Sequence, residues 1–266
     1  MTPGAQPSGA RAIPTPGKEA AALEIGAGQT PSLVITGERT VPGIWHENYW
    51  FRRHEAVYVG IASELDDAVV LEAGCGEGYG AQLVAKRARS VVALDYDAYA
   101  IAHVGRAYPA LAVVRGNLVA LPFGAATYDA VVSLQTVEHL WDQDAFVAEC
   151  RRVLRPGGRL ILSTPNRLTF PSGNPFHARD LSAAELRGLV TRHGGKAALH
   201  GLRHGPELVD WERRHGSLVD TQLATSPDQW PVGLAKRVGA VGVGDFVLAD
   251  GDVDTSLDLV AVVTFD

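Results

Sequence analysis

The chain has 266 residues, of which 46% are hydrophobic and 20% are charged. These proportions are usual for a globular protein and exclude a fibrous, coiled-coil or wholly disordered chain. The formal net charge of -6 has the wrong sign for a protein that neutralises many phosphates, so we expect no nucleic-acid partner. Two cysteines without metal-type spacing, no run long enough to span a membrane and no export signal predict a cytoplasmic protein.

The beginning of the chain differs in composition from the remainder. Residues 1–32 are rich in Pro, Gly, Ala and Ser and have no apolar periodicity, which predicts a disordered tail. We expect residues 33–266 to form a single domain. Within it, the near-helical spacing of Trp50, Val57 and Ile61 predicts one helix over residues 44–65, ahead of the core.

Strand-like and helix-like segments alternate from residue 69 onward. Seven segments have the composition of strands: 69–72, 91–94, 111–114, 130–134, 159–163, 196–202 and 257–265. Helices are predicted over 81–88, 98–107 and 143–154, and another begins at a capping box formed by Ser182 and Glu185. This alternation predicts an α/β fold with a mostly parallel sheet. Residues 156–158, Pro-Gly-Gly, are expected to separate the third of these helices from its strand, and residues 205–245 to form an insertion before the last strand.

A glycine-rich loop follows the first predicted strand. That strand ends at Glu72, and the next residues read AGCGEGYG, so the backbone can approach a ligand closely at the mouth of the sheet. Asp95 ends the second strand, where a carboxylate can accept hydrogen bonds from both hydroxyls of a ribose. Gly76, Gly78 and Ala81 also match the G-x-G-x-x-A pattern of dinucleotide sites, so the residues up to this point fit either kind of nucleotide.

The segment after the third predicted strand helps to distinguish between the two kinds of nucleotide ligand. Asn117 places an amide where an adenine edge would lie, and Leu121, Pro122 and Phe123 supply an apolar wall. No second phosphate loop follows, which disfavours a dinucleotide. The successive motifs EAGCGEGYGA, LDYD, GNLVALPF, YDAVVSLQTVEHL and RVLRPGGRLILSTPN closely resemble those of class I S-adenosylmethionine-dependent methyltransferases, over about residues 65–203.

This resemblance implies a Rossmann-like class I methyltransferase fold with helices on both faces of the sheet, and S-adenosylmethionine as the cofactor. It implies that Glu72 helps to hold the methionine amino group, that Asp95 binds the ribose and that Gln135 meets the methionine end. The glycine loop would pass beneath the cofactor, and the residues after the third strand would frame the adenine. The positions assigned to the cofactor are Tyr49, Glu72, Gly74, Cys75, Gly76, Gly78, Asp95, Tyr96, Asn117, Leu118 and Gln135.

A finer resemblance covers nearly all of the folded part. The segments TGERTVP, ENYWFRRH, EHLWDQ, STPNRLTF, NPFH, HGPEL and SLDLVAV are similar to actinobacterial methyltransferases assigned to the synthesis of 6-O-methylglucose lipopolysaccharides. The resemblance implies methylation of a hydroxyl on an oligosaccharide or a related small molecule. Alternatives are O- or N-methylation of a secondary metabolite or a quinone, and a regulator that binds the cofactor without catalysis.

Candidate catalytic residues follow the fourth predicted strand. A hydroxyl acceptor has to lose its proton, and histidine titrates in the required pH range. Gln135, Glu138 and His139 have the spacing of one helical turn, with His139 as the predicted base and Glu138 beside it. His177 of the NPFH segment is the second candidate. The turn could also hold a divalent cation. However, Gln135 replaces the first acid of the similar pattern in some quinone-pathway methyltransferases, so we expect no metal.

Two further segments are expected to border the site. On the predicted helix before the core, Tyr49 and Arg53 could close over the methionine carboxylate. In the insertion, Trp211 and Trp230 accompany a run of charged residues, and we expect residues 205–245 to act as a lid over the acceptor.

Overall fold

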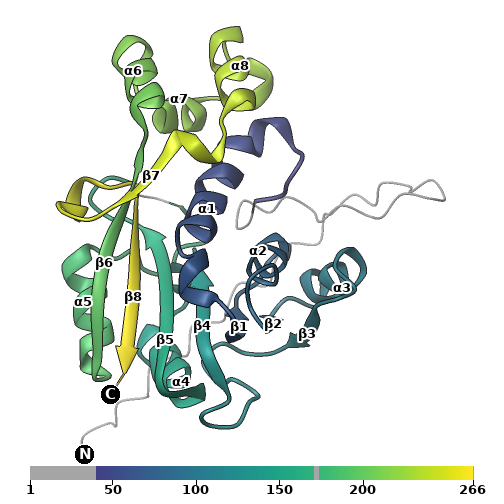
Figure 1. Cartoon of the computed structure of the whole chain (residues 1–266). Helices are drawn as coiled ribbons and strands as arrows, with labels where there is room; N and C mark the ends of the chain where they lie inside the picture. Colours follow the sequence, from purple (N-terminus) through teal and green to yellow (C-terminus); the bar gives the residue numbers. More distant parts are fainter. Residues whose placement is uncertain (1–39, 171–173, 266) are drawn as a thin grey trace, which may run out of the picture. The chain divides into compact units, whose positions relative to one another are not determined.

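The structure is a computed structural model that describes residues 40–170 and 174–265 (Figure 1). The predicted tail, residues 1–32, lies outside the described residues. The described part is built on one sheet of eight strands in the order β3-β2-β1-β4-β5-β8-β6-β7. The strands are β1 (Val69–Ala73), β2 (Ser90–Asp95), β3 (Ala112–Arg115), β4 (Tyr128–Leu134), β5 (Leu154–Pro165), β6 (Gly195–His204), β7 (Phe246–Ala249) and β8 (Asp258–Phe265).

The direction of the strands creates a site at one edge of the sheet. Strands β1 to β5 pair in parallel, whereas β8 is antiparallel to both β5 and β6, and β7 is antiparallel to β6. The chain runs outward from β1 through β2 to β3 and then returns to β4 on the other side of β1. The loops after β1 and β4 therefore diverge at the carboxyl edge, which is where open α/β sheets bind their ligands.

The predicted number of seven strands is wrong by one. The additional strand is β7, which is four residues long, pairs only with β6 and lies at the edge of the sheet. A strand this short carries too little alternation to be recognised, and its partner is distant in sequence. The expected separation at Pro156–Gly158 is also wrong, because β5 begins at Leu154, directly after α4. Two features accommodate residues 156–158 within the strand. The pairing of β5 with β4 shifts register between Tyr128 and Ala130, and Gly157 has a left-handed backbone (φ +76°).

Helices cover both faces of the sheet. The predicted helix before the core is α1 (Asn48–Gly60), flanked by the 3-10 turns η1 (Trp45–Glu47) and η2 (Ala62–Leu65). The other helices of the core are α2 (Tyr79–Val84), α3 (Ala98–Ala107), α4 (Gln143–Val153) and α5 (Ala183–Arg192). The capping box of Ser182 and Glu185 is present at the start of α5, as predicted. Alternate residues of the central strands belong to two hydrophobic cores, so that Val70 packs with α1 and α2 whereas Leu71 packs with α4 and α5.

Three more helices follow β6: α6 (Pro206–His215), α7 (Leu218–Ala224) and α8 (Val232–Ala240). In Figure 1 they gather at the end of the sheet toward which β5 points, next to the start of α1. The side-chain amide of Asn48 donates hydrogen bonds to the carbonyl oxygens of Val238 and Val241, each at 2.9 Å, and so joins α1 to α8. Four shorter turns complete the described elements: η3 (Val137–His139), η4 (Pro227–Gln229), η5 (Val243–Asp245) and η6 (Val253–Thr255). Among the described helices, none has the length and hydrophobicity needed to cross a membrane.

A buried ion pair joins α1 to the last strand. Arg53 donates from Nε to Asp258 Oδ2 at 2.7 Å and from Nη2 to Asp258 Oδ1 at 2.5 Å, and Nη2 also reaches the carbonyl oxygen of Leu257 at 2.9 Å. The two side chains are only 3% and 0% exposed. Two parallel bonds to a carboxylate use the planar geometry of the guanidinium, and they compensate both charges inside the protein.

We predict that Asp258→Asn lowers the free energy of unfolding by about 3–5 kcal/mol, because it leaves the Arg53 charge buried without a counterion. Urea denaturation followed by circular dichroism measures this change. The control is Asp66→Asn, which removes the exposed partner of Arg87 and should leave the unfolding midpoint close to that of the unmodified protein. Equal midpoints for the two variants would contradict the prediction.

Candidate active site

The loop after β1 combines two kinds of glycine. A Cβ on Gly74 would come within 2.6 Å of the Thr136 side chain, and one on Gly78 within 2.7 Å of Val104, so these two positions serve close packing. Gly76 is also left-handed (φ +52°), but a Cβ there would meet nothing within 4 Å. The backbone at Gly76 therefore borders open space, as expected for a loop that passes beneath a ligand.

Asp95 stands directly against this loop. Its carboxylate accepts hydrogen bonds from the backbone N–H groups of Gly76 (2.8 Å) and Asp97 (2.9 Å). The tip of the glycine loop and the end of β2 are thereby held together at the switch point of the sheet. The other positions predicted for this part of the site differ in accessibility, since Tyr96 is exposed whereas Cys75 and Leu118 are buried. Asn117 accepts from the N–H of Val119 at 3.1 Å, which fixes the turn after β3.

Glu72 is a buried carboxyl group at the end of β1. It is 1% exposed, and the Tyr58 hydroxyl donates to its Oε1 at 2.5 Å. Its Oε2 is buried and has no hydrogen-bond partner among the described residues. Desolvation raises the pKa of Glu72 to about 8. A buried acceptor without a partner is suited to a cationic donor, such as the amino group of an amino acid.

A cavity of about 270 Å³ adjoins this region and is bounded by α1, the end of β4, the end of β5 and α7. Its lining residues are Thr40, Glu47, Trp50, Arg53, His54, Gln135, Glu138, His139, Pro165, Phe170, Asn174, His177 and Leu223. Arg53 is one of these residues, and its buried Nη1 has no hydrogen-bond partner among the described residues. Desolvation of His54 in its wall lowers the pKa of this imidazole to about 4, so His54 is neutral at physiological pH.

Tyr49 interacts with Arg53, the residue with which the sequence pairs it, but it is not among the residues that line the cavity. It is fully buried, its hydroxyl lies 2.7 Å from Nε2 of His204, and its ring packs against Phe246 at a centroid distance of 5.6 Å. These contacts turn Tyr49 toward β6 and β7. Sequence reasoning could not anticipate them, because β7 was not recognised as a strand.

The three predicted residues after β4 all line the cavity, but they do not form one helical turn. Gln135 has a left-handed backbone (φ 50°), and its N–H donates to the carbonyl oxygen of Ser163 at 2.9 Å. Only Val137–His139 form a turn, of the 3-10 type. The prediction of one α-helical turn is therefore wrong, because pairing with β5 holds the backbone of Gln135.

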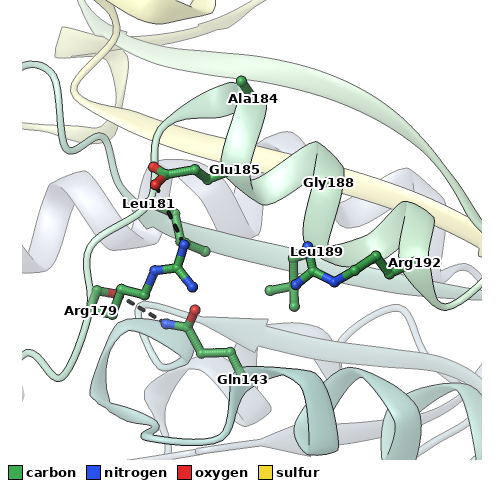
Figure 2. A pocket seen from close by; sticks show the side chains of 8 residues that line it. All are labelled: Gln143, Arg179, Leu181, Ala184, Glu185, Gly188, Leu189 and Arg192. Carbon is green, nitrogen blue, oxygen red and sulfur yellow. Dashed lines mark hydrogen bonds and ion pairs between the residues drawn. The ribbon is translucent and has the colours of Figure 1, made fainter.

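A loop from the segment after β5 packs on this turn and brings His177 to it. The N–H groups of Ala178 and Arg179 donate to the carbonyl oxygen of Glu138, at 2.8 Å and 3.1 Å. The Gln143 side-chain amide bridges the carbonyl oxygens of Val137 and Arg179, at 2.9 Å and 3.0 Å, and Figure 2 shows its bond to Arg179. As a result, the His139 and His177 rings lie edge to face, with a centroid distance of 4.9 Å.

Hydrogen bonds orient both imidazole rings. His139 Nδ1 lies 3.0 Å from the carbonyl oxygen of Phe176, which can only accept, so Nδ1 carries the proton and the neutral ring has its lone pair on Nε2. His177 Nδ1 lies 2.6 Å from Asp180 Oδ1, and its Nε2 lies 2.9 Å from the side-chain amide nitrogen of Asn174. His177 therefore donates through Nδ1 and accepts through Nε2.

Glu138 is the most buried member of this group. It is 1% exposed, its Oε2 has no hydrogen-bond partner within the described parts of the chain, and desolvation raises the pKa of Glu138 to about 8. The potential ligand atoms of Glu138, His139 and His177 all lie within 4.8 Å of one another. The sequence predicted the three residues, but it missed Asn174 and Asp180, whose positions three residues before and after His177 could have indicated them.

A second cavity, of about 280 Å³, lies between Gln143 and α5 (Figure 2). Its charged residues already have ionic partners, since Arg179 pairs with Glu185 and Arg192 pairs with Asp144. It contains no residue predicted to bind a ligand, and we assign it no part in the site.

The doubly wound sheet with a glycine loop after β1 and a carboxylate after β2 defines a Rossmann-like, nucleotide-binding class of enzyme. Residues 71–162 match the model of a family described as a methyltransferase domain. A probable S-adenosylmethionine-dependent methyltransferase of Mycobacterium tuberculosis is 50% identical over 243 residues, which are 86% of this chain and 89% of that protein. The chain belongs to the S-adenosylmethionine-dependent methyltransferases, and S-adenosylmethionine is its cofactor.

Two other similarities are more distant. A fatty-acid O-methyltransferase of Mycolicibacterium smegmatis is 36% identical over 172 residues, which are 58% of this chain and 61% of that protein. The structure of a possible histamine N-methyltransferase of Thermotoga maritima has a TM-score of 0.56 at 16% identity, and the match covers 82% of this chain and 93% of that one. At this identity the structural match supports the fold alone.

We predict that Asp95→Ala weakens the binding of S-adenosylhomocysteine about 10- to 100-fold, because a charge-assisted hydrogen bond contributes about 1.5–3 kcal/mol. Isothermal titration calorimetry measures the affinity. Asp97→Asn is the matched control, since it removes a charge two residues away and Asn preserves the cap of α3. If both variants bind as tightly as the unmodified protein, Asp95 does not hold the ribose.

A proton should leave Glu72 when the cofactor binds. With the pKa of Glu72 raised to about 8, this carboxyl is mostly protonated at pH 7, and pairing with a cationic amino group lowers its pKa. Calorimetry at pH 7 in buffers of different ionisation enthalpy should therefore show proton release, and the affinity should rise between pH 6 and pH 7.5. Glu72→Gln should abolish this release. Equal release from the variant and the unmodified protein would assign the proton to another group.

Proposed function

We propose that this methyltransferase transfers the methyl group of S-adenosylmethionine to a hydroxyl group of a saccharide. The observation that carries the proposal is the convergence of Glu138, His139 and His177 on one cavity beside the cofactor loop. Thr136 packs against Gly74, so the turn that bears Glu138 and His139 lies next to that loop. The acceptor would enter the cavity, with its oxygen toward the methyl group.

The chemistry of the cluster favours a hydroxyl over a carboxyl group. A carboxylate is already ionised at neutral pH, whereas a hydroxyl has to lose its proton as the methyl group is transferred. The partial similarity to a fatty-acid O-methyltransferase supports oxygen as the accepting atom. The cluster of Glu138, His139 and His177 therefore supports an acceptor group that has to be deprotonated by the protein.

When no metal ion is bound, His139 acts as the base that takes the proton from the acceptor hydroxyl. Its neutral ring carries the lone pair on Nε2, because Nδ1 donates to Phe176. His177, whose ring is held by Asp180 and Asn174, would be a second contact for the acceptor. Glu138 is mostly protonated at pH 7 and would bind the acceptor as a neutral carboxyl group. Alignment of oxygen, methyl carbon and sulfur supplies the remainder of the rate enhancement.

Aromatic side chains near the cluster support a saccharide acceptor. Trp141 and Phe176 are 92% and 39% exposed, and they belong to the two segments that carry His139 and His177. Trp45 is 49% exposed and contacts Trp230 with a ring-centroid distance of 5.7 Å. Exposed aromatic faces suit stacking on sugar rings. The resemblance to methyltransferases of 6-O-methylglucose lipopolysaccharide synthesis points to a glucan, and we propose this as the acceptor class.

Residues 205–245 would close the acceptor site. Leu223 of α7 lines the cavity, and α8 is bound to Asn48 at the start of α1. The contact of Leu223 with the cavity supports the predicted role of this segment as a lid.

Incubation of the protein with labelled S-adenosylmethionine and a panel of acceptors tests the proposal. The panel contains α-glucan oligosaccharides, a catechol-type quinone precursor and a free fatty acid, and mass spectrometry locates the label. We expect transfer to a saccharide hydroxyl. Transfer to the phenol or the carboxyl group alone would overturn the saccharide assignment, and cofactor binding without transfer to any hydroxyl would favour a non-catalytic regulator.

We predict that His139→Ala lowers kcat at least about 100-fold and leaves the affinity for S-adenosylhomocysteine within a few-fold of the original. His177→Ala should raise KM for the acceptor more than it lowers kcat. His200→Ala is the control, because this histidine pairs with Asp250 on another part of the sheet. If His177→Ala instead shows the loss in kcat, the two roles must be exchanged.

A further inference from the structure

We propose that Glu138, His139 and His177 form a binding site for a divalent first-row transition-metal cation at the acceptor end of the cavity. This inference rests on the proposed function, replaces the expectation from the sequence that no metal binds, and specifies how the cluster assists the acceptor. The three side chains come from two segments, the turn after β4 and the loop after β5, yet their potential ligand atoms lie within 4.8 Å of one another. This spacing allows all three to reach a single ion.

One oxygen of the Glu138 carboxyl group, Oε2, lacks a hydrogen-bond partner among the described residues, although the side chain of Thr164 lies close enough to offset part of the rise in pKa that desolvation causes. The group is 1% exposed. Arg53 pairs with Asp258 through Nε and Nη2, and its remaining Nη1 forms no hydrogen bond with Glu138. The Arg179 guanidinium pairs with Glu185. A polar oxygen that is buried without a partner is costly. A cation between Glu138 and the two histidines would satisfy it.

The two histidines have the environment of metal ligands. Each ring donates from Nδ1 to an oxygen, the Phe176 carbonyl for His139 and the Asp180 carboxylate for His177. Such bonds orient the imidazole and leave the lone pair on the other nitrogen, Nε2, as in most histidines that bind metals. The lone pair of His177 accepts from Asn174 in this structure. The same lone pair would bind the ion once the Asn174 amide turns away.

The site is held in place by bonds that need no ion. Four hydrogen bonds from Ala178, Arg179 and Gln143 lock the loop of His177 onto the turn of Glu138 and His139. Ligands that are placed in advance lose little conformational freedom on binding, which strengthens a metal site.

The donor set indicates the type of ion. Mg²⁺ and Ca²⁺ prefer oxygen ligands throughout, whereas two imidazoles with one carboxylate suit Zn²⁺, Mn²⁺, Fe²⁺ or Co²⁺. Three protein ligands leave coordination positions open for an acceptor hydroxyl, whose pKa the cation would lower. The O–H bond then breaks with its proton going to solvent, and the oxygen forms a bond to the methyl carbon. The carbon–sulfur bond breaks, and its electron pair returns to sulfur to give S-adenosylhomocysteine. In this form His139 is a ligand and not the base.

Cobalt binding to the full chain tests the site without reference to turnover. After treatment with EDTA and removal of the chelator at pH 7.5, titration with Co²⁺ should give a visible absorption band that saturates at one equivalent. Glu138→Gln and His177→Ala should each weaken Co²⁺ binding at least about 100-fold, and Asp180→Asn about 10- to 100-fold. His200→Ala and Asn174→Ala should bind at least as tightly as the unmodified protein. Circular dichroism confirms that each variant is folded.

The result separates this proposal from the proposed function. If S-adenosylhomocysteine binds and methyl transfer proceeds, but neither Co²⁺, Zn²⁺ nor Mn²⁺ binds, the cation site is wrong and the methyltransferase assignment stands. Equal Co²⁺ affinity in the unmodified protein, Glu138→Gln, His177→Ala and Asp180→Asn would also overturn the site. If Co²⁺ binds as expected but no saccharide accepts the methyl group, the proposed acceptor class fails while the metal site remains.

Discussion

The buried ion pair between Arg53 and Asp258 connects the two ends of the described fold and shapes the cavity between them. Arg53 belongs to α1, the first long helix, and Asp258 begins β8, the last strand. A charge pair this deeply buried is maintained only when both partners are present in the correct geometry. Because Arg53 also lines the cavity, the same contact that docks α1 on the sheet fixes a cationic residue in the cavity wall.

We propose that the active site has two chemically different halves. In the cofactor half, backbone and acidic groups at the ends of β1 and β2 would provide close approach and hydrogen-bond acceptors for a cationic nucleoside. In the acceptor half, two histidines and a buried carboxyl group converge from the segments after β4 and β5. Desolvation raises the pKa of both Glu72 and Glu138 to about 8, so each half contains a buried acid whose ionisation depends on what binds beside it.

Local sequence patterns predicted most of the parallel half of the sheet. The strands β1 to β4 have strong apolar runs, and the capping box at Ser182 marks the start of α5 through contacts within a few residues. The predictions failed where strand pairing between distant segments outweighs the secondary-structure preference of the local sequence. Pro156 and Gly157 belong to β5 because β4 pairs with that segment through an irregular register. The four-residue β7 forms because its backbone pairs with β6.

The sequence by itself determined seven of the eight strands, the helices before β6, and the histidines and acids available for chemistry, since these follow from patterns along the chain. Its resemblance to known methyltransferases implied the family and the cofactor. Only the tertiary structure decided which of these residues meet. It buried Tyr49 against His204 and Arg53, placed His177 beside His139, and joined Asn174 and Asp180 to that cluster. The physical reason is that such contacts link residues far apart in the chain. They form only when burial and backbone hydrogen bonding of the intervening elements bring these residues to the same edge of the sheet.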